Sequence, residues 1–348
     1  MIKRWVVIYP VGRTSAVTGG HKYEDNLWET ISSCDVVELH RDALFARRML
    51  ASKLLSPLKC IRKAWSLRGF DGVFLNSSTF FYLLPLSFLL KLAGKEVLIV
   101  HHHFIYLEFS GLKRALYRLG EWLFLKSASR IVSPSPYIEM ELKRRGFGNV
   151  MLWPIPFERI KSEQNPEPTE GNLVYVGTIE PRKGLKYLFE ALAVLCGKGV
   201  RFRLQIIGKT VDTSYEDELK SYAGTRNLPV EFLGFVAKET KHEVLCRGDI
   251  FVFPSLLEGF GMVLAEAQCY GLPIVCFDNS AMPFTVRHGE NGLLCGNGDV
   301  QQLAENIRTI LQDRALRARM SRRALKDSES LCSQADFKKK VIDDISRL

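Results

Sequence analysis

The sequence predicts an α/β protein made of two doubly wound domains, each built on a parallel sheet. At 348 residues the chain exceeds the usual size of one hydrophobic core, and its 47% apolar and 25% charged residues are typical of a globular protein. Short apolar runs alternate with longer amphipathic ones, which is the pattern of repeated strand–helix–strand units. The pattern stops near the middle of the chain and then restarts, which indicates two domains.

Five apolar runs predict the strands of the first half, and the segments between them predict its helices. The strands are WVVIYP (5–10), DVVEL (35–39), GVFLN (72–76), EVLIVHHH (96–103) and RIVSPS (130–135). The helices are KYEDNLWETI (22–31), LFARRMLASKLL (44–55) and LKRALYRLGEWLFLKSA (112–128). TFFYLLPLSFLLKLAG (79–94) is too short in its uncharged part to span a bilayer and predicts a buried helix.

The second half repeats this pattern after a linker. WPIPFERIKSEQNPEPTEGN (153–172) is rich in Pro, Glu, Asn and Ser and has no helical or strand period. The strands that follow are NLVYVG (172–177), FRLQIIG (202–208), VEFLGF (230–235), DIFVFPS (249–255) and PIVCF (273–277). We therefore expect a first domain over 1–155, a linker over 156–170 and a second domain over 171–332, with a helix at 333–348 packing back on the first.

Cysteines and the first residues bear on the compartment. The eight cysteines form no C-x-x-C pair and no ligand spacing with histidine, so reduced thiols in a cytosolic protein are expected. The start, MIKRWVVIYPVGRT, has basic residues before an apolar run, as a signal peptide has. Pro10 and Gly12 interrupt that run, which favours a buried first strand.

The net charge lies entirely in the first half of the chain. Residues 1–150 hold 22 Lys and Arg against 12 Asp and Glu, whereas the remainder is balanced. An anionic partner for the first half is implied. No helix-turn-helix, zinc-ligand or RNP-like pattern is present, so we expect no nucleic-acid partner.

The stretch FPSLLEGFGMVLAEAQCYGLPIV (253–275) predicts an anion site after a strand. A helix beginning near Gly261 or Met262 would offer unsatisfied N–H groups, and Gly259 and Gly261 would let the backbone approach a phosphate. Glu258 precedes the helix and Glu266 lies about one turn into it. Carboxylates accept hydrogen bonds from vicinal diols, which suits the two sugars of a sugar nucleotide. A capped helix with ordinary first-turn acids is the alternative.

A pair of cations follows the strand NLVYVG. In GTIEPRKGLKYLFEAL, Arg182 and Lys183 stand between a strand and a helix, where they could neutralise a diphosphate. A solvated Arg–Lys pair would explain them equally well when they are taken alone.

These segments together resemble the nucleotide-sugar-binding domain of family 4 glycosyltransferases, retaining enzymes of GT-B architecture with two facing Rossmann-like domains. The resemblance rests on EGFGMVLAEAQCYGLPIV, YVGTIEPRKGLKYLFEAL, FLGFVAKETKHEVLCRGDIFVFPSLLEG and ENGLLCGNGD, and covers about residues 171–315. A weaker likeness in the first half rests on the Gly19–Gly20 turn and EVLIVHH.

The resemblance implies roles for individual residues. Glu258 is similar to the acid that contacts the donor hexose, Glu266 to the acid that holds the ribose, and Lys183 to the diphosphate-binding lysine. His102 fits the histidine near the transferred sugar, with its register within His101–His103 left open, and Gly20 fits a glycine turn near the donor phosphate. The full donor-binding set expected is Gly20, Gly177, Gly259, Phe260, Gly261, Met262, Val263 and Glu266, beside the catalytic set His102, Glu258, Lys183 and Arg182.

The sequence departs from the family pattern at two places. Thr178 stands where the family usually has an arginine, and Arg182 is the candidate replacement. In DNSAMPFTV, Ser280 and Phe284 stand where glycines and a glutamate are common, which leaves the accepted sugar open.

The expected function is retaining transfer of a sugar from a nucleoside diphosphate to a glycan or lipid-linked acceptor, in surface polysaccharide or glycolipid assembly. The alternative is a non-transferring sugar-nucleotide protein of the same architecture, an epimerase or a silent partner. Cations that stabilise the leaving diphosphate, and the lack of a D-x-D-like pair, predict transfer without a metal or other cofactor.

A basic, partly apolar segment suggests where an anionic partner would bind. Residues 40–71 hold eight Lys or Arg against two Asp, with interleaved apolar residues, as in a helix on an anionic membrane surface. A Rossmann helix with a solvated basic face is the alternative. The expected location is the cytoplasm, with peripheral binding to the inner face of the plasma membrane through 40–71.

Overall fold

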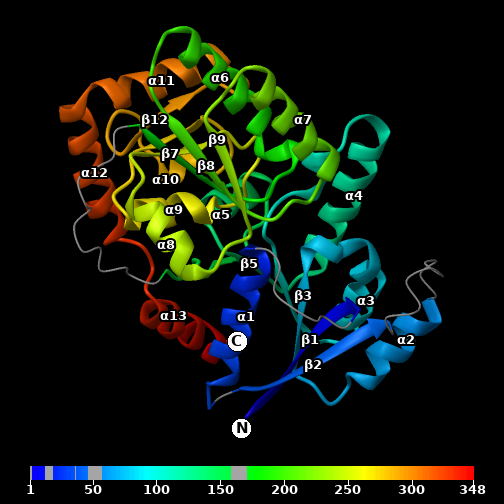
Figure 1. Ribbon diagram of the computed structural model, residues 1–348. Coiled ribbons are helices and arrows are strands. Elements are labelled where there is room, and N and C mark those ends of the chain that lie inside the picture. Colours follow the sequence, from blue (N-terminus) through cyan, green and yellow to red (C-terminus); the bar gives the residue numbers. More distant parts are fainter. Residues whose placement is uncertain (1, 12–18, 36, 46–56, 158–170) are drawn as a thin grey trace. The chain divides into compact units, whose positions relative to one another are not determined.

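The computed structural model describes residues 2–11, 19–35, 37–45, 57–157 and 171–348 (Figure 1). The chain forms two compact units, each with its own sheet and core. The first unit contains Met1–Pro156 and Cys332–Leu348, and the second contains Phe157–Leu331.

The first unit is built on a parallel six-stranded sheet in the order β2-β1-β3-β4-β5-β6. Its strands are β1 (Lys3–Val11), β2 (Val37–Phe45), β3 (Gly72–Asn76), β4 (Glu96–Val100), β5 (Arg130–Ser133) and β6 (Val150–Leu152). Its helices are α1 (Gly19–Ser32), α2 (Pro57–Ser66), α3 (Phe80–Leu92), α4 (Gly111–Ser127), α5 (Pro136–Arg144) and α13 (Gln334–Ser346), with short 3-10 turns η2 (Ser77–Thr79) and η3 (Ile105–Glu108). The central strands are buried on both faces, as parallel strands between helices must be.

The helices of this unit cover the two faces of the sheet. Helix α2 packs against α3 and α3 against α4, whereas α1 packs against α13 on the opposite side of the sheet (Figure 1). Tyr23 of α1 meets Phe337 of α13 with ring centroids 5.9 Å apart, and Trp153 Nε1 donates to Asp344 Oδ2 at 2.9 Å. The C-terminal helix thus belongs to the core of the first unit.

The second unit contains another parallel six-stranded sheet, in the order β12-β11-β10-β7-β8-β9. Its strands are β7 (Asn172–Val176), β8 (Arg203–Ile207), β9 (Val230–Gly234), β10 (Ile250–Phe253), β11 (Ile274–Phe277) and β12 (Gly292–Cys295). Its helices are α6 (Leu185–Gly197), α7 (Thr213–Thr225), α8 (Lys238–Cys246), α9 (Met262–Cys269), α10 (Met282–Thr285), α11 (Val300–Gln312) and α12 (Arg314–Ser328), with the turn η4 (Pro181–Lys183). Two doubly wound parallel sheets confirm the expected fold class.

One expected helix is wrong in its first residues. The helix predicted over 44–55 begins inside β2, which continues to Phe45, while 46–56 lie outside the described residues. Residues 44 and 45 belong to the strand because β2 pairs with β1 along its whole length, from Val37 opposite Lys3 to Phe45 opposite Val11. Strands β6 and β12, which lie at the edges of the two sheets, were not predicted.

Two further expectations concern apolar segments and cysteines. The 79–94 segment forms α3 as predicted, but Phe81, Phe88 and Leu92 on that helix are exposed, so it is buried on one side only. All eight cysteines are free thiols.

Among the described residues, no helix combines the length and the apolar character needed to cross a membrane.

Candidate functional site

Two loops meet at the carboxyl ends of β7 and β10 in the second unit. The strands are hydrogen-bonded neighbours, so the turn η4 after β7 lies beside the loop after β10. Leu256 N donates to Arg182 O at 2.9 Å and joins the loops directly. Gly184 makes this approach possible, because its φ of 69° is left-handed and a Cβ there would lie 1.9 Å from Pro254 O.

Glu258 lies at the centre of this junction. Lys183 Nζ donates to Glu258 Oε1 at 2.5 Å, and Ser255 Oγ donates to the same oxygen at 2.9 Å. The side chains of Lys183 and Glu258 are each only 12% exposed. The predicted acid and the predicted diphosphate-binding lysine therefore meet in one largely buried ion pair, and Ser255 is a partner that the sequence reasoning missed.

Arg182 lies at the edge of the same cluster. Its Nη1 donates to Leu257 O at 2.8 Å and lies 3.8 Å from Glu258 Oε1, while Nη2 donates to Glu180 Oε1 at 2.9 Å. Thr178, at the position of the missing arginine, donates its hydroxyl to the same Glu180 oxygen at 2.8 Å. The guanidinium is thus held near Glu258 by contacts to Leu257 O and Glu180.

Helix α9 begins at Met262, as the sequence predicted, after Gly261 in the left-handed region (φ 76°). The N–H groups of Met262 and Val263 have no partner within the helix by its geometry, whereas Leu264 N donates to Gly261 O at 2.8 Å. Phe260 stacks on Phe157 with centroids 5.7 Å apart, and Gly259 lies between Glu258 and this ring. The glycine-bearing turn and the helix start are therefore present where the anion site was expected.

Glu266 lies one turn into α9 but does not join the Glu258 cluster. Its Oε1 pairs with Lys241 Nζ of α8, and both side chains are about a quarter exposed. Lys241 was missed by the sequence reasoning, because nothing in FVAKETKHEVL indicates that α8 lies beside α9.

Ser280 supports Glu258 from a third loop. Its hydroxyl accepts from Glu258 N at 3.0 Å, and its φ of 42° is unusual for a residue with a side chain. Ser280 is one of the two departures from the family pattern, and here it fixes the backbone of the central acid.

Tyr175 and Gly177 lie beneath the cluster. Burial raises the pKa of Tyr175 well above its usual value, and the nearby Glu258 and Glu180 raise it further. The phenol therefore stays protonated and donates to Thr178 O at 3.0 Å. Gly177 N donates to Ile207 O at 2.9 Å, so this amide is used inside the second unit.

In the first unit, His102 follows β4 and forms a pair with Glu24 of α1. His102 Nε2 lies 3.0 Å from Glu24 Oε1, and Asn76 Nδ2 at the end of β3 donates to the same oxygen. Tyr23 packs edge-on against the His102 ring at 5.6 Å. Glu24 is 1% exposed, and its role as the partner of His102 had no signal in the sequence.

The three consecutive histidines have different surroundings. His101 is fully buried and its Nδ1 lies 2.8 Å from Ser77 Oγ, whereas His102 is partly exposed. Burial lowers the pKa of His101 well below its usual value, and neighbouring histidines and Arg145 act in the same direction. Gly20 lies in the first turn of α1, just after residues 12–18, which are outside the described residues.

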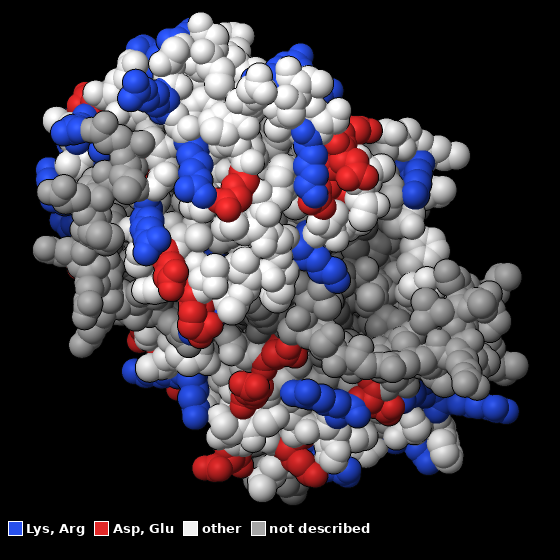
Figure 2. Space-filling view, in the orientation of Figure 1, with Lys and Arg blue, Asp and Glu red and all other residues white. Residues whose placement is uncertain are grey.

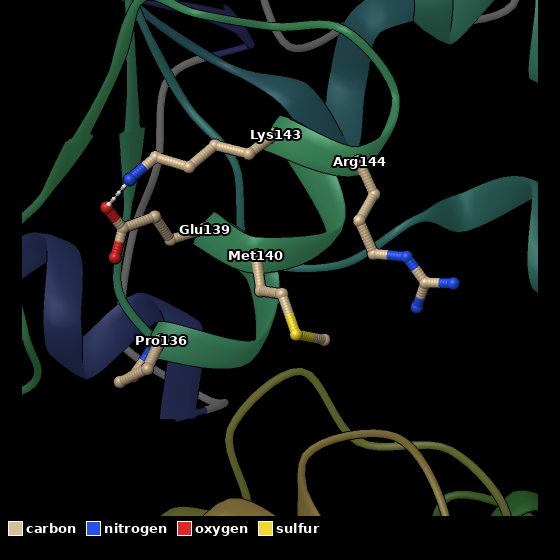
Figure 3. A pocket seen from close by; sticks show the side chains of 5 residues that line it. All are labelled: Pro136, Glu139, Met140, Lys143 and Arg144. Carbon is tan, nitrogen blue, oxygen red and sulfur yellow. Dashed lines mark hydrogen bonds and ion pairs between the residues drawn. The ribbon is translucent and has the colours of Figure 1, made fainter.

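Two shallow depressions lie away from these clusters. One is formed by α5 alone, where Glu139 Oε1 accepts from Lys143 Nζ at 2.6 Å while Arg144 extends to the other side of the helix (Figure 3). The other lies on α7. The second is lined by polar and charged side chains of α7 and its C-cap, and none of the predicted site residues lines either depression. Within the described part of the chain, no group of three or more His, Cys, Asp or Glu could hold a metal ion.

The segment that contains Lys183 and Glu258 is similar to a known protein family. The family model "Glycosyl transferases group 1" matches residues 156–327. This segment resembles the group 1 glycosyl transferases and makes up just under half of the chain. The group 1 segment contains Lys183, Glu258 and Glu266, whereas His102 lies outside it.

Curated relatives of the chain include enzymes of surface-polysaccharide synthesis. O-antigen chain mannosyltransferase B of Escherichia coli is 32% identical over 45% of this chain and 41% of its own length. The capsular polysaccharide biosynthesis glycosyltransferase CapM of Staphylococcus aureus is 31% identical over 41% of this chain and 37% of its own. These matches span less than half of each relative. An uncharacterized glycosyltransferase of Haemophilus influenzae is 25% identical over 74% of this chain and 70% of its own.

Solved structures resemble the whole chain. Anabaena HepE in complex with UDP and glucose has a TM-score of 0.77 at 16% identity, covering 99% of this chain and all of that one. The lipopolysaccharide outer core galactosyltransferase WaaB gives 0.75 at 18%, with the same coverage. At these identities the likeness shows the fold alone, and it confirms the GT-B class of two Rossmann-like domains.

The surface charge of the group 1 segment agrees with its neutral sequence. On the visible face of the second unit, basic and acidic side chains are intermixed, with no broad area of one sign (Figure 2). The basic excess of the first half is therefore not matched by a basic surface on this face of the second unit.

Proposed function

We propose that the protein transfers a sugar, with retention of anomeric configuration, from a nucleoside-diphosphate sugar to a glycan or lipid-linked acceptor in surface polysaccharide or glycolipid assembly. The observation that carries the proposal is the Lys183–Glu258 pair, joined by Arg182, at the strand ends of a group 1 segment. The named relatives in O-antigen and capsule synthesis support the acceptor class.

The pair has the polarity that a sugar nucleotide requires. The carboxylate of Glu258 can accept hydrogen bonds from sugar hydroxyls, and the ammonium of Lys183 can bind phosphate oxygens. In the donor, the sugar hydroxyls and the diphosphate lie on opposite sides of the bond between the anomeric carbon and the diphosphate oxygen. The Glu258 carboxylate and the Lys183 ammonium are 2.5 Å apart, so one can contact the sugar and the other the diphosphate. A donor would separate the pair and give each member a new partner.

The leaving diphosphate gains negative charge in the transition state. Lys183, Arg182 and the N–H groups at the start of α9 are the groups of this chain that can stabilise it, and such fixed cations and dipoles are commonly the largest catalytic contribution. Glu266 would accept from the ribose hydroxyls, and His102, held by Glu24, would contact the transferred sugar. Glu258 orients the sugar and is not assigned as a covalent nucleophile.

The experiment that tests the function is a donor panel with and without acceptor. UDP-sugars come first in the panel, because HepE was crystallised with UDP and with UDP-glucose. Acceptor-dependent release of nucleoside diphosphate supports transfer. Donor binding without release under any acceptor would favour the alternative, a sugar-nucleotide protein that does not transfer.

We also propose that transfer needs no divalent metal, because Lys183 and Arg182 carry the charge that a metal would supply. Activity should survive EDTA. If turnover disappears in EDTA and returns with magnesium or manganese, the cation-only description of the site is wrong.

A further inference from the structure

The outer side of three neighbouring helices in the first unit is apolar. On α4, Leu112, Leu116 and Leu119 are 77%, 57% and 55% exposed. On α3, Phe81, Phe88 and Leu92 are 51%, 37% and 83% exposed, and on α2 Ile61 and Trp65 are 51% and 64% exposed. Because α2 packs against α3 and α3 against α4, these residues belong to one layer.

The residues form rows along each helix. Positions 112, 116, 119 and 123 are all leucine, and positions 81, 85, 88 and 92 are Phe, Pro, Phe and Leu. Each set has the spacing i, i+4, i+7, i+11, which places its members on one side of a helix. Single exposed apolar residues are normal on a protein surface, but aligned rows on adjacent helices are not.

The rows are not the core-facing sides of these helices. On α4, Glu121, Phe124 and Leu125 are buried, and their helical angles lie opposite those of the leucine row. On α3, Leu83, Leu86 and Leu90 are buried in the same way. Each helix therefore has one apolar side in the core and a second apolar side in solvent, where folding gains nothing from it.

Basic residues accompany the rows. The described side chains of the three helices include Arg62, Lys63, Lys91, Lys113, Arg114, Arg118 and Lys126, and the acid Glu121 of α4 is buried. Lys126 lies 5.6 Å from the Trp122 ring and Arg68, just after α2, lies 3.6 Å from the Trp65 ring. Long cationic side chains beside exposed aromatic rings suit the headgroup level of a bilayer.

We propose that the outer side of α2, α3 and α4 docks on an anionic lipid surface. A second copy of the chain is a poorer occupant, because a two-fold interface would place the same basic residues opposite each other. An anionic lipid surface instead receives both the leucine and phenylalanine rows and the cations.

This surface differs from the one expected from the sequence. Residues 46–56 of the 40–71 segment lie outside the described residues, including Arg47 and Arg48, and Lys63 pairs with Asp42. Only α2 of that segment joins the proposed surface, and most of the apolar contribution comes from α3 and α4. The inference stands independently of the transfer activity.

Vesicle sedimentation tests the proposal. The full chain should bind vesicles of phosphatidylcholine with phosphatidylglycerol and leave vesicles of phosphatidylcholine alone largely free. Each basic residue near the surface adds roughly fivefold to partitioning, so binding should fall steeply as salt is raised from about 0.01 M to about 1 M, where the Debye length shrinks from about 30 to about 3 Å.

Two double variants separate the apolar and charged contributions. Leu116→Ser with Leu119→Ser should lower partitioning by about tenfold or more, and Lys113→Gln with Arg118→Gln should do so mainly at low salt. Matched controls in the second unit are Val211→Ser with Phe235→Ser, which are 60% and 84% exposed, and Arg319→Gln with Arg322→Gln. The controls should bind vesicles as the wild type does.

Three outcomes would overturn the inference. They are equal binding to neutral and anionic vesicles, unchanged binding of both α4 variants, and a wild-type dimer in solution that the leucine variant abolishes. The last would make the helices an interface between copies. Because all four substituted α4 positions are exposed, melting temperatures should match the wild type, and if the leucine variant fails to fold, the charge variant still decides.

Discussion

Lys183 and Glu258 are 75 positions apart in the sequence, yet Lys183 Nζ lies 2.5 Å from Glu258 Oε1. The contact exists because β7 and β10 are adjacent in the sheet and each side chain follows the end of its strand. It joins the two groups to which the proposed function assigns the sugar and the diphosphate.

Replacing both cations should lower turnover more than replacing either. Lys183→Ala is expected to reduce kcat by about 10²-fold, since a positioned charge at the leaving group is lost. Because Arg182 serves the same group, the double change need not equal the product of the single ones. Lys198→Ala, at the exposed C-cap that follows α6, is the control and should be silent. A silent Arg182→Ala would show that Arg182 does not replace the arginine missing at Thr178.

Glu266→Ala should weaken donor binding by about tenfold to a hundredfold, or roughly 1.5 to 3 kcal/mol, because ribose hydroxyls lose a charged acceptor. Lys241→Ala should have a much smaller effect, since its pair with Glu266 is partly exposed and the carboxylate has a second oxygen. Titration calorimetry with the nucleotide measures both. Equal affinity of a folded Glu266→Ala variant and the wild type would remove Glu266 from the site.

Gly184→Ala should destabilise the second unit and displace Lys183. A Cβ at Gly184 would lie 1.9 Å from Pro254 O, so η4 must move away from the loop after β10. Gly199 is a matched control, because its φ of 68° is nearly the same and no atom lies within 4 Å of its Cβ position. Gly199→Ala should cost only the left-handed strain, about 1 kcal/mol of unfolding free energy. Similar melting curves for the two variants would show that the close approach is unimportant.

The buried His101 should make stability depend on pH. Its pKa is lowered in the folded state, so the unfolded chain binds the proton first as the pH falls below about 6.5. Stability contributed by the neutral ring is therefore present above that pH and lost below it, with a slope of at most about 1.4 kcal/mol per pH unit. His101→Gln should flatten this part of the denaturation profile. An unchanged slope in the His101 variant would assign the dependence to other groups.

Much of the site was predictable because its elements are local. The strand NLVYVG, the turn at Arg182 and Lys183, and the start of α9 at Met262 follow from apolar runs, glycines and helix signals within short windows. Glu258 and Glu266 were chosen from one such window, and the family resemblance gave them distinct roles.

Residues that act as partners were not predictable. Lys241, Ser255, Ser280 and Glu24 gain their contacts only when separate loops and helices meet, and no period or spacing in one segment indicates a contact with another. The same reason explains the surface of α2, α3 and α4. The sequence predicted a buried helix at 79–94 because its apolar residues are many, but periodicity alone does not say which of two apolar sides reaches the core.

The sequence by itself determined the class of the fold, the two sheets and the positions after the strands where charged residues gather, since each depends on the order of short apolar runs along the chain. Tertiary structure decided which strands are neighbours, so that Lys183 reaches Glu258 while Glu266 pairs with Lys241. It also decided that the leucine row of α4 points to solvent, because burial on the sheet can take only one side of a helix and Phe124 and Leu125 occupy that side.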